Sequence, residues 1–131
     1  DNTKALLMTR AMAEITRLGE KLGGTRLTFG GLAGMGDLIV TCTSMHSRNN
    51  RAGILIGQGK TVQKAMEEVG AVVEGYYAAE SIHQLSTREG VEMPISQSVY
   101  EVLYQGKAVR DVVSELMGRA KKDELLERCW L

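Results

Sequence analysis

One stretch of the chain, residues 30–53, gathers glycines, an acid, hydroxyls and a cation at spacings suited to binding a small anion. Glycines let a backbone approach a ligand closely, and here four of them lead into Asp37. Ten residues later a hydroxyl, a cation and two amides follow in a row, as Ser47, Arg48, Asn49 and Asn50. An arginine fork matches phosphate, and the start of a helix adds free N–H groups. The stretch therefore predicts a site for a small phosphorylated molecule.

Asp37 and Thr41 are four residues apart, so on a helix they share one face. A carboxylate and a hydroxyl on that face could bind a substrate hydroxyl or orient a general base. The structural alternative is that Asp37 complements the helix dipole while Thr41 bonds back to its own backbone. Both interpretations stay open at this stage.

Three further features have a functional and a structural interpretation. The Ser47–Asn49 block is either an anion site or a plain helix cap followed by solvated side chains. Glu74, between Val73 and Gly75, is either an acceptor for ribose hydroxyls or an exposed loop carboxylate. The two histidines, His46 and His83, have no triad or metal partner at a useful spacing, which predicts surface or interface roles.

Composition bounds the class of protein. The chain has 131 residues, 44% of them hydrophobic, which suffices for one domain with a core. Sixteen basic residues balance sixteen acidic ones, so no global field attracts nucleic acid or an anionic membrane. No apolar run approaches the ~20 residues that span a bilayer. Cys42 and Cys129 lie far apart without metal-site spacing, which predicts a reduced, cytoplasmic protein with neither disulfide nor metal.

The elements that position these residues are predicted to be helices. Residues 38–42 would suit a strand by propensity, but no second strand is available, so a buried helix beginning near Met35 or Gly36 is expected. Residues 71–75 are predicted to be an extended connector, and Gly118 to break the last helical pattern before a partly helical tail. The other helices are expected over residues 3–22, 48–56, 62–69, 76–89, 94–105 and 109–117. The predicted fold is all-α, one domain of seven or eight helices, with the four tyrosines in the core or on a dimer surface.

Three blocks resemble a known family: GLAGMGDLIVTCTSMHSRNNRAG (31–53), VVEGYYAAESI (72–82) and VEMPISQSVYEVLYQG (91–106). They are similar to bacterial NAD(P)-dependent sn-glycerol-3-phosphate dehydrogenases, from residue 1 to about residue 127. The resemblance implies that residues 1–131 form the C-terminal helical substrate-binding domain of the 6-phosphogluconate/glycerol-3-phosphate dehydrogenase type. It also implies the reaction, the interconversion of dihydroxyacetone phosphate and sn-glycerol 3-phosphate by hydride transfer with NAD or NADP, which feeds phospholipid synthesis.

The resemblance further implies residue roles. The substrate-binding residues would be Asp37, Thr41, Ser47, Arg48 and Asn49, with Asp37 and Thr41 supporting catalysis. Contacts to the cofactor would come from Arg48, Val72 and Glu74. The family's catalytic lysine is expected upstream of this chain, and Lys4, in a different local context, is not assigned that role. A homodimer is also implied.

The chain opens at Asp1 without a methionine and contains no GxGxxG after a strand. We therefore expect a piece of a longer protein that lacks its N-terminal Rossmann domain and is inactive alone. Two alternatives stay open: the helical domain of a 6-phosphogluconate-type dehydrogenase, and a non-catalytic all-α dimerisation module. A helix-turn-helix DNA-binding module is disfavoured by the balanced charge.

Overall fold

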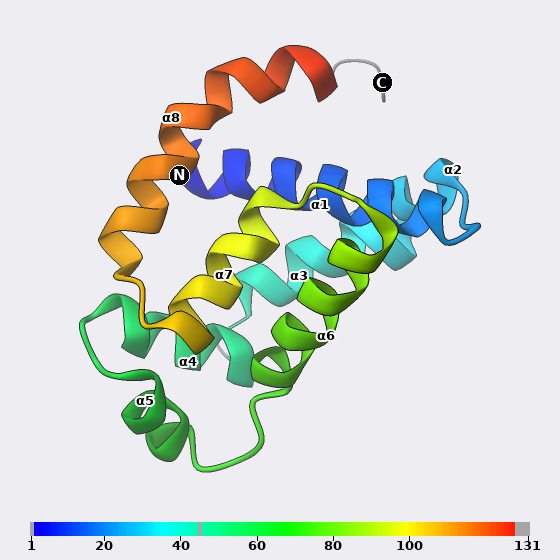
Figure 1. Cartoon of the computed structure of the whole chain (residues 1–131). Coiled ribbons are helices and arrows are strands. Elements are labelled where there is room, and N and C mark those ends of the chain that lie inside the picture. Colours follow the sequence, from blue (N-terminus) through cyan, green and yellow to red (C-terminus); the bar gives the residue numbers. More distant parts are fainter. Residues whose placement is uncertain (1, 45, 128–131) are drawn as a thin grey trace.

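A computed structural model describes residues 2–44 and 46–127 of the chain, and within them all regular structure is helical (Figure 1). In these described residues, eight α-helices and one π-helix follow one another through short links. They are α1 (Asn2–Lys21), α2 (Arg26–Gly30), η1 (Leu32–Gly36), α3 (Asp37–Thr43), α4 (Arg48–Gly57), α5 (Val62–Val69), α6 (Glu74–Glu89), α7 (Pro94–Gln105) and α8 (Val109–Glu127). The all-α prediction is confirmed. Asp1, Cys129 and the end of the predicted tail, 128–131, lie outside the described residues.

The helix boundaries follow local sequence rules in most places. Ser47 caps α4, its Oγ accepting a hydrogen bond from Asn50 N at 3.2 Å, and Thr61 caps α5 in the same way. The helices α5, α6 and α7 each end at a glycine with positive φ, at Gly70, Gly90 and Gly106. Glycine adopts this left-handed conformation without the clash that a Cβ would cause.

Three predictions about the elements were wrong in detail. Residues 37–43 form a helix, but not a buried one, because α3 packs by one side only and Ile39 and Val40 are 46% and 67% exposed. The helix α6 begins at Glu74, so Glu74 lies in its first turn rather than in the connector. Gly118 does not break α8, which continues to Glu127. A glycine inside a helix costs only about 1 kcal/mol relative to alanine, which the good helix formers around it offset.

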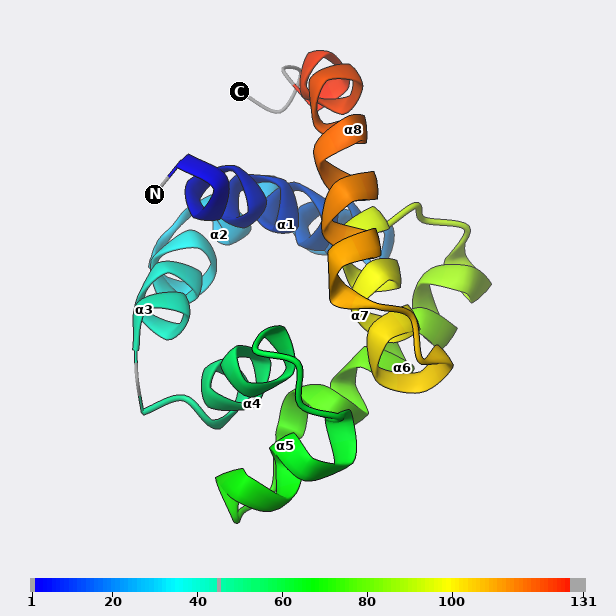
Figure 2. The ribbon, with the colours of Figure 1, turned by 90° about the vertical axis from the view of Figure 1, so that its left-hand side faces the viewer.

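The long helix α1 organises the fold. It contacts α2, α3, α6 and α7 (Figure 2), and its buried side chains include Met12 and Leu18. Its Glu14 is 2% exposed and reaches the start of α7, where both carboxylate oxygens accept a hydrogen bond from Ile95 N, at 2.5 and 3.1 Å. Because Pro94 has no N–H, Ile95 provides the first donor of α7. A buried carboxylate on α1 therefore caps α7.

A second packing unit holds α4 in place. Ala52 on α4, Val69 on α5 and Val73 before α6 form a buried apolar cluster. Leu55 and Met66 pack against it. This cluster fixes the start of α6 relative to α4.

The tyrosines pack mainly against one another between α6 and α7. The rings of Tyr76, Tyr104, Tyr100 and His83 stack in sequence, with centroid distances of 4.6, 5.2 and 3.8 Å. The hydroxyl of Tyr104 donates to the Tyr76 carbonyl oxygen, and Tyr77 meets Tyr76 edge-on. Three of the four tyrosines are half-buried rather than part of the buried core, while Tyr77 is 60% exposed.

Candidate functional site

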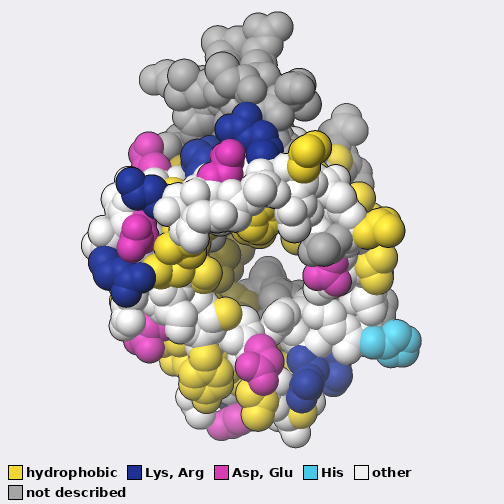
Figure 3. Space-filling model, turned by 90° about the vertical axis from the view of Figure 1, so that its right-hand side faces the viewer, with side chains coloured by type: hydrophobic (Ala, Val, Ile, Leu, Met, Phe, Trp, Pro, Cys, Tyr) yellow, Lys and Arg dark blue, Asp and Glu magenta, His cyan; other side chains and the backbone are white. Residues whose placement is uncertain are grey.

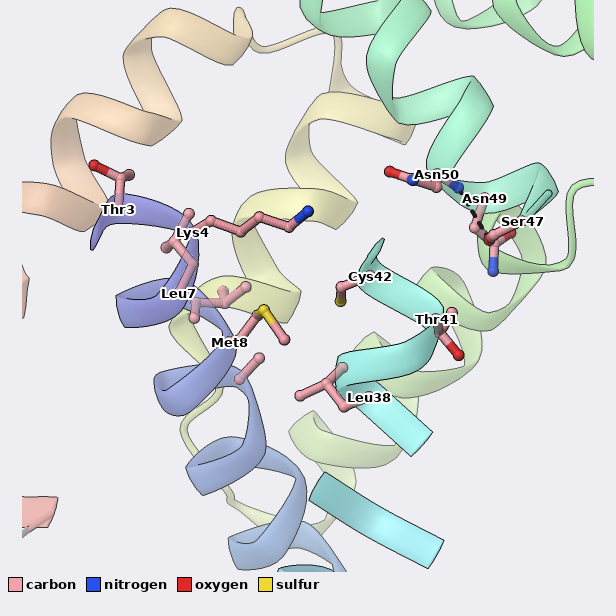
Figure 4. Close-up of a pocket in the computed structure, with 12 residues that line it drawn as sticks. Thr3, Lys4, Leu7, Met8, Leu38, Thr41, Cys42, Ser47, Asn49 and Asn50 are labelled. Carbon is pink, nitrogen blue, oxygen red and sulfur yellow. Dashed lines mark hydrogen bonds between the residues drawn. The ribbon is translucent and has the colours of Figure 1, made fainter. Parts of the chain in front are cut away.

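A cavity of about 590 Å³ lies between α1, α3, α4 and α7 (Figure 4), and some of the predicted substrate residues line it. From α1, α3 and α7 the cavity is lined by Thr3, Lys4, Leu7, Met8, Ala11, Leu38, Thr41, Cys42 and Ile95. The α4 side contributes Ser47, Asn49 and Asn50. Three of the five predicted substrate residues, Thr41, Ser47 and Asn49, therefore share one cavity.

The cavity has an apolar side and a polar side. Leu7 and Met8 of α1 face Leu38 of α3, while the start of α4 presents hydroxyl and amide groups (Figure 4). The Lys4 side chain extends from α1 across the cavity toward Asn50 of α4 (Figure 4). A cation and several hydrogen-bond donors beside apolar walls suit an anionic ligand with a small carbon skeleton.

The polar side is fixed by hydrogen bonds around the start of α4. Asn50 donates through its side chain to the Ser44 carbonyl oxygen at 2.8 Å and through its backbone to Ser47. The backbone N–H of His46 donates to Ser44 Oγ at 3.1 Å. These bonds shape the turn that leads into α4. The structural role expected for Ser47 as a cap is confirmed, and its hydroxyl also borders the cavity.

The remaining predicted substrate residues lie outside the cavity lining. Asp37 and Thr41 are one turn apart on α3 as expected, and both are exposed. Arg48 is the first residue of α4, and its side chain is exposed. The cavity lining includes Thr41 but neither Asp37 nor Arg48.

The segment predicted to contact the cofactor lies next to the substrate block. Val72 is 55% exposed, and the Glu74 carboxylate is exposed at the start of α6. Asn49 Oδ1 accepts a hydrogen bond of 2.8 Å from Gly75 N. This bond joins residues 26 positions apart in the sequence and brings the block 47–49 next to the start of α6.

At Gly34 the glycine-rich segment uses its lack of a side chain for internal packing. A Cβ at Gly34 would lie 2.0 Å from the carbonyl oxygen of Phe29. The Phe29 ring in turn lies where a Cβ at Gly19 would be, at 2.2 Å. Gly34 thus permits η1 to pack closely against α2, and Gly19 permits α2 to pack closely against α1.

Acidic and basic side chains are mixed on one face of the molecule. On the face shown in Figure 3, acidic and basic side chains are interspersed around a central hollow with hydrophobic side chains at its edge.

Outside the cavity, a hydrogen bond to Glu115 raises the pKa of Lys107, and burial raises the pKa of Tyr104. Among the described residues no group of three His, Cys, Asp or Glu side chains could hold a metal ion, and no helix there is long and apolar enough to cross a membrane.

Comparison with known proteins decides the family. Residues 1–114 match the model of the NAD-dependent glycerol-3-phosphate dehydrogenase C-terminus. The chain belongs to this family. The resemblance inferred from the three sequence blocks is confirmed, and with it the all-α fold of the C-terminal domain of glycerol-3-phosphate dehydrogenases.

Curated relatives and a solved structure agree. A glycerol-3-phosphate dehydrogenase (NAD(P)+) of Clostridium perfringens is 62% identical over 95% of this chain and 38% of its own length. The Moorella thermoacetica protein of the same name is 53% identical over 99% of this chain and 39% of its own length. The crystal structure of a Coxiella burnetii glycerol-3-phosphate dehydrogenase superposes with a TM-score of 0.87, at 37% identity over 89% of this chain and 36% of that one. The chain thus spans about two fifths of the length of these relatives.

Sequence reasoning missed several residues at the site. Lys4 and Cys42 line the cavity. Lys4 lies outside the three sequence blocks, and Cys42 lies within the block 31–53 but was not singled out as a ligand contact. Cys42 is half-buried with a free thiol, and Cys129 lies outside the described residues. Gly75 was treated only as a flank of Glu74, because its contact with Asn49 spans 26 residues and leaves no local pattern.

Proposed function

We propose that this chain is the substrate-binding domain of an enzyme that interconverts dihydroxyacetone phosphate and sn-glycerol 3-phosphate with NAD(P)H. The observation that carries the proposal is the shared location of Thr41, Ser47 and Asn49 at one cavity, in a chain of this family. The names of the relatives, glycerol-3-phosphate dehydrogenase (NAD(P)+), support the reaction.

In the proposed complex the residues of α4 hold the phosphate. The exposed guanidinium of Arg48 and the polar groups of Ser47 and Asn49 offer donors at the start of one helix. Anchoring the phosphate fixes the position of the carbonyl carbon several ångströms away, so binding energy from the remote group lowers the barrier to reaction.

The residues of α3 act nearer the reacting carbon. Reducing a ketone develops negative charge on its oxygen, which must be stabilised or protonated as it forms. We assign to Asp37 and Thr41 the binding of the substrate hydroxyl and the alignment of a proton donor. That donor is the lysine expected upstream of this chain.

The surface at the start of α6 fits a nicotinamide nucleotide. The exposed carboxylate of Glu74 can accept hydrogen bonds from ribose hydroxyls, and the exposed Val72 side chain offers an apolar contact to a ring. Arg48 lies at the start of α4, the helix that Asn49 links to α6, and can pair with a phosphate of the nucleotide. NAD(P)H supplies the hydride when bound.

We further propose that residues 1–131 act with an N-terminal Rossmann domain in a cytoplasmic homodimer that supplies phospholipid synthesis, and that this chain alone is inactive. The test is NADPH oxidation by the complete gene product. Turnover with dihydroxyacetone phosphate, and no NADP reduction with 6-phosphogluconate, supports the proposal. The reverse substrate preference would favour the 6-phosphogluconate-type alternative, and turnover of neither would favour a non-catalytic module.

A further inference from the structure

The helix α6 lacks a cap of its own. Its N-cap residue is Val73, whose side chain has no acceptor, so the first N–H groups of the helix need partners from elsewhere. Asn49, 26 residues earlier and on another helix, provides one of them. Its Oδ1 accepts from Gly75 N at 2.8 Å. A predicted substrate residue therefore caps the helix that begins with the predicted cofactor residue Glu74.

This bond determines how the Asn49 carboxamide is oriented. A backbone N–H can only donate, so the atom that faces Gly75 N must be the carboxamide oxygen and not its nitrogen. Because oxygen and nitrogen occupy opposite branches of a planar group, fixing one fixes the other. Nδ2 then remains as the polar group that Asn49 offers to a ligand in the cavity it lines.

The contact depends on the absence of a side chain at residue 75. A Cβ there would lie 2.9 Å from Asn49 Oδ1 and 3.0 Å from Asn49 Cγ, so the carboxamide would have to move. The backbone does not require glycine, because Gly75 is absent from the residues with positive φ. In the first turn of a helix, glycine is also a poorer helix former than alanine. The close approach of Asn49 is thus the physical reason for glycine at this position.

We propose that Gly75 is a positioning residue for the substrate: it orients the Asn49 carboxamide so that Nδ2 donates to the anionic group of the ligand. This inference rests on the proposed function. Since Gly75 directly follows Glu74, the same contact ties the substrate block on α4 to the cofactor segment at the start of α6.

The test uses steady-state kinetics of the complete gene product with dihydroxyacetone phosphate and NADPH. Gly75→Ala is compared with Gly53→Ala, a matched control in α4 where an added Cβ would meet nothing within 4 Å. We expect Gly75→Ala to raise the KM for dihydroxyacetone phosphate about tenfold, with kcat and the KM for NADPH within about twofold of the unmodified enzyme. Gly53→Ala should leave all three values unchanged.

A double-mutant cycle separates positioning from a general structural effect. If Gly75 acts through the Asn49 carboxamide, Gly75→Ala should have no further effect on KM once Asn49→Ala has removed that group. Asn49→Asp keeps the acceptor for Gly75 N but replaces the donor by a negative charge. It should therefore raise the KM for dihydroxyacetone phosphate at least tenfold without lowering the melting temperature.

Each outcome bears on the proposal. A KM for Gly75→Ala equal to that of Gly53→Ala would overturn it, and so would KM increases for Gly75→Ala and Asn49→Ala that multiply in the double variant. Both results leave the proposed function intact, because the unmodified enzyme still turns over. Failure of the unmodified protein to oxidise NADPH with dihydroxyacetone phosphate would overturn both the proposed function and the inference.

Discussion

The carboxylate of Glu14 offers a test of how the walls of the cavity are held together. Glu14 lies on α1, is 2% exposed, and caps α7 through two hydrogen bonds from Ile95 N. Ile95 itself lines the cavity. In Glu14→Ala the Ile95 N–H loses its acceptor, which costs about 1–3 kcal/mol for a buried donor. The lost attraction between a carboxylate and the helix N-terminus adds about 1 kcal/mol.

We therefore expect Glu14→Ala to lower the free energy of unfolding by about 3 kcal/mol, and Glu14→Gln by about 1 kcal/mol. Glutamine keeps one oxygen acceptor for Ile95 N, at the shorter of the two contacts, while it loses the charge and replaces the second oxygen with an amide nitrogen. The measurement is urea unfolding of the 131-residue chain, followed by far-UV circular dichroism. Equal destabilisation by the two substitutions would refute the hydrogen bond as the main contribution. An alanine variant within about 0.5 kcal/mol of the unmodified chain would refute the cap altogether.

Two further predictions concern helix ends and packing. Thr61→Ala should lower the free energy of unfolding by about 1 kcal/mol, because Thr61 Oγ1 accepts a hydrogen bond from Lys64 N at 3.2 Å. Thr61→Ser keeps the hydroxyl and should retain most of that stability in the same urea titration. Equal unfolding free energies for the two variants would contradict the capping role. Burial raises the pKa of Tyr104 above its ordinary 10.0. The neutral Tyr104 side chain therefore contributes its full stability to the fold below pH 10. That stability is lost as the pH rises through the raised pKa that Tyr104 has in the folded protein. Unfolding free energies measured at pH 9 and pH 11 should therefore fall more for the unmodified chain than for Tyr104→Phe, and an identical fall would contradict the assignment.

The parts of the fold that sequence could predict are those governed by neighbours in the chain. Ser47 and Thr61 cap helices because a hydroxyl three residues before a free N–H can reach it. Gly70, Gly90 and Gly106 end helices because the left-handed conformation there favours glycine. Gly118 shows the limit of the rule, since a glycine without that conformation sits within a continuous helix.

The parts that sequence could not predict depend on contacts across the chain. Glu14 meets Ile95 across 81 residues, and Asn49 meets Gly75 across 26. Neither contact leaves a periodic pattern, because each involves a single polar side chain and a backbone group. The same holds for Lys4, which reaches the cavity only because α1 crosses beside α3 (Figure 4). The motif around residues 31–53 indicated where the site lies but not which of its residues border the cavity.

The measurement that tests the proposed function most directly compares two arginines of α4 in the complete gene product. Arg48 and Arg51 are both exposed and lie three residues apart on the same helix. Arg48→Ala should raise the KM for dihydroxyacetone phosphate in NADPH oxidation by at least tenfold, because it removes the proposed phosphate anchor. Arg51→Ala, which removes an equal charge, should change it less than twofold. Equal KM values for the two variants would contradict a phosphate site at the start of α4.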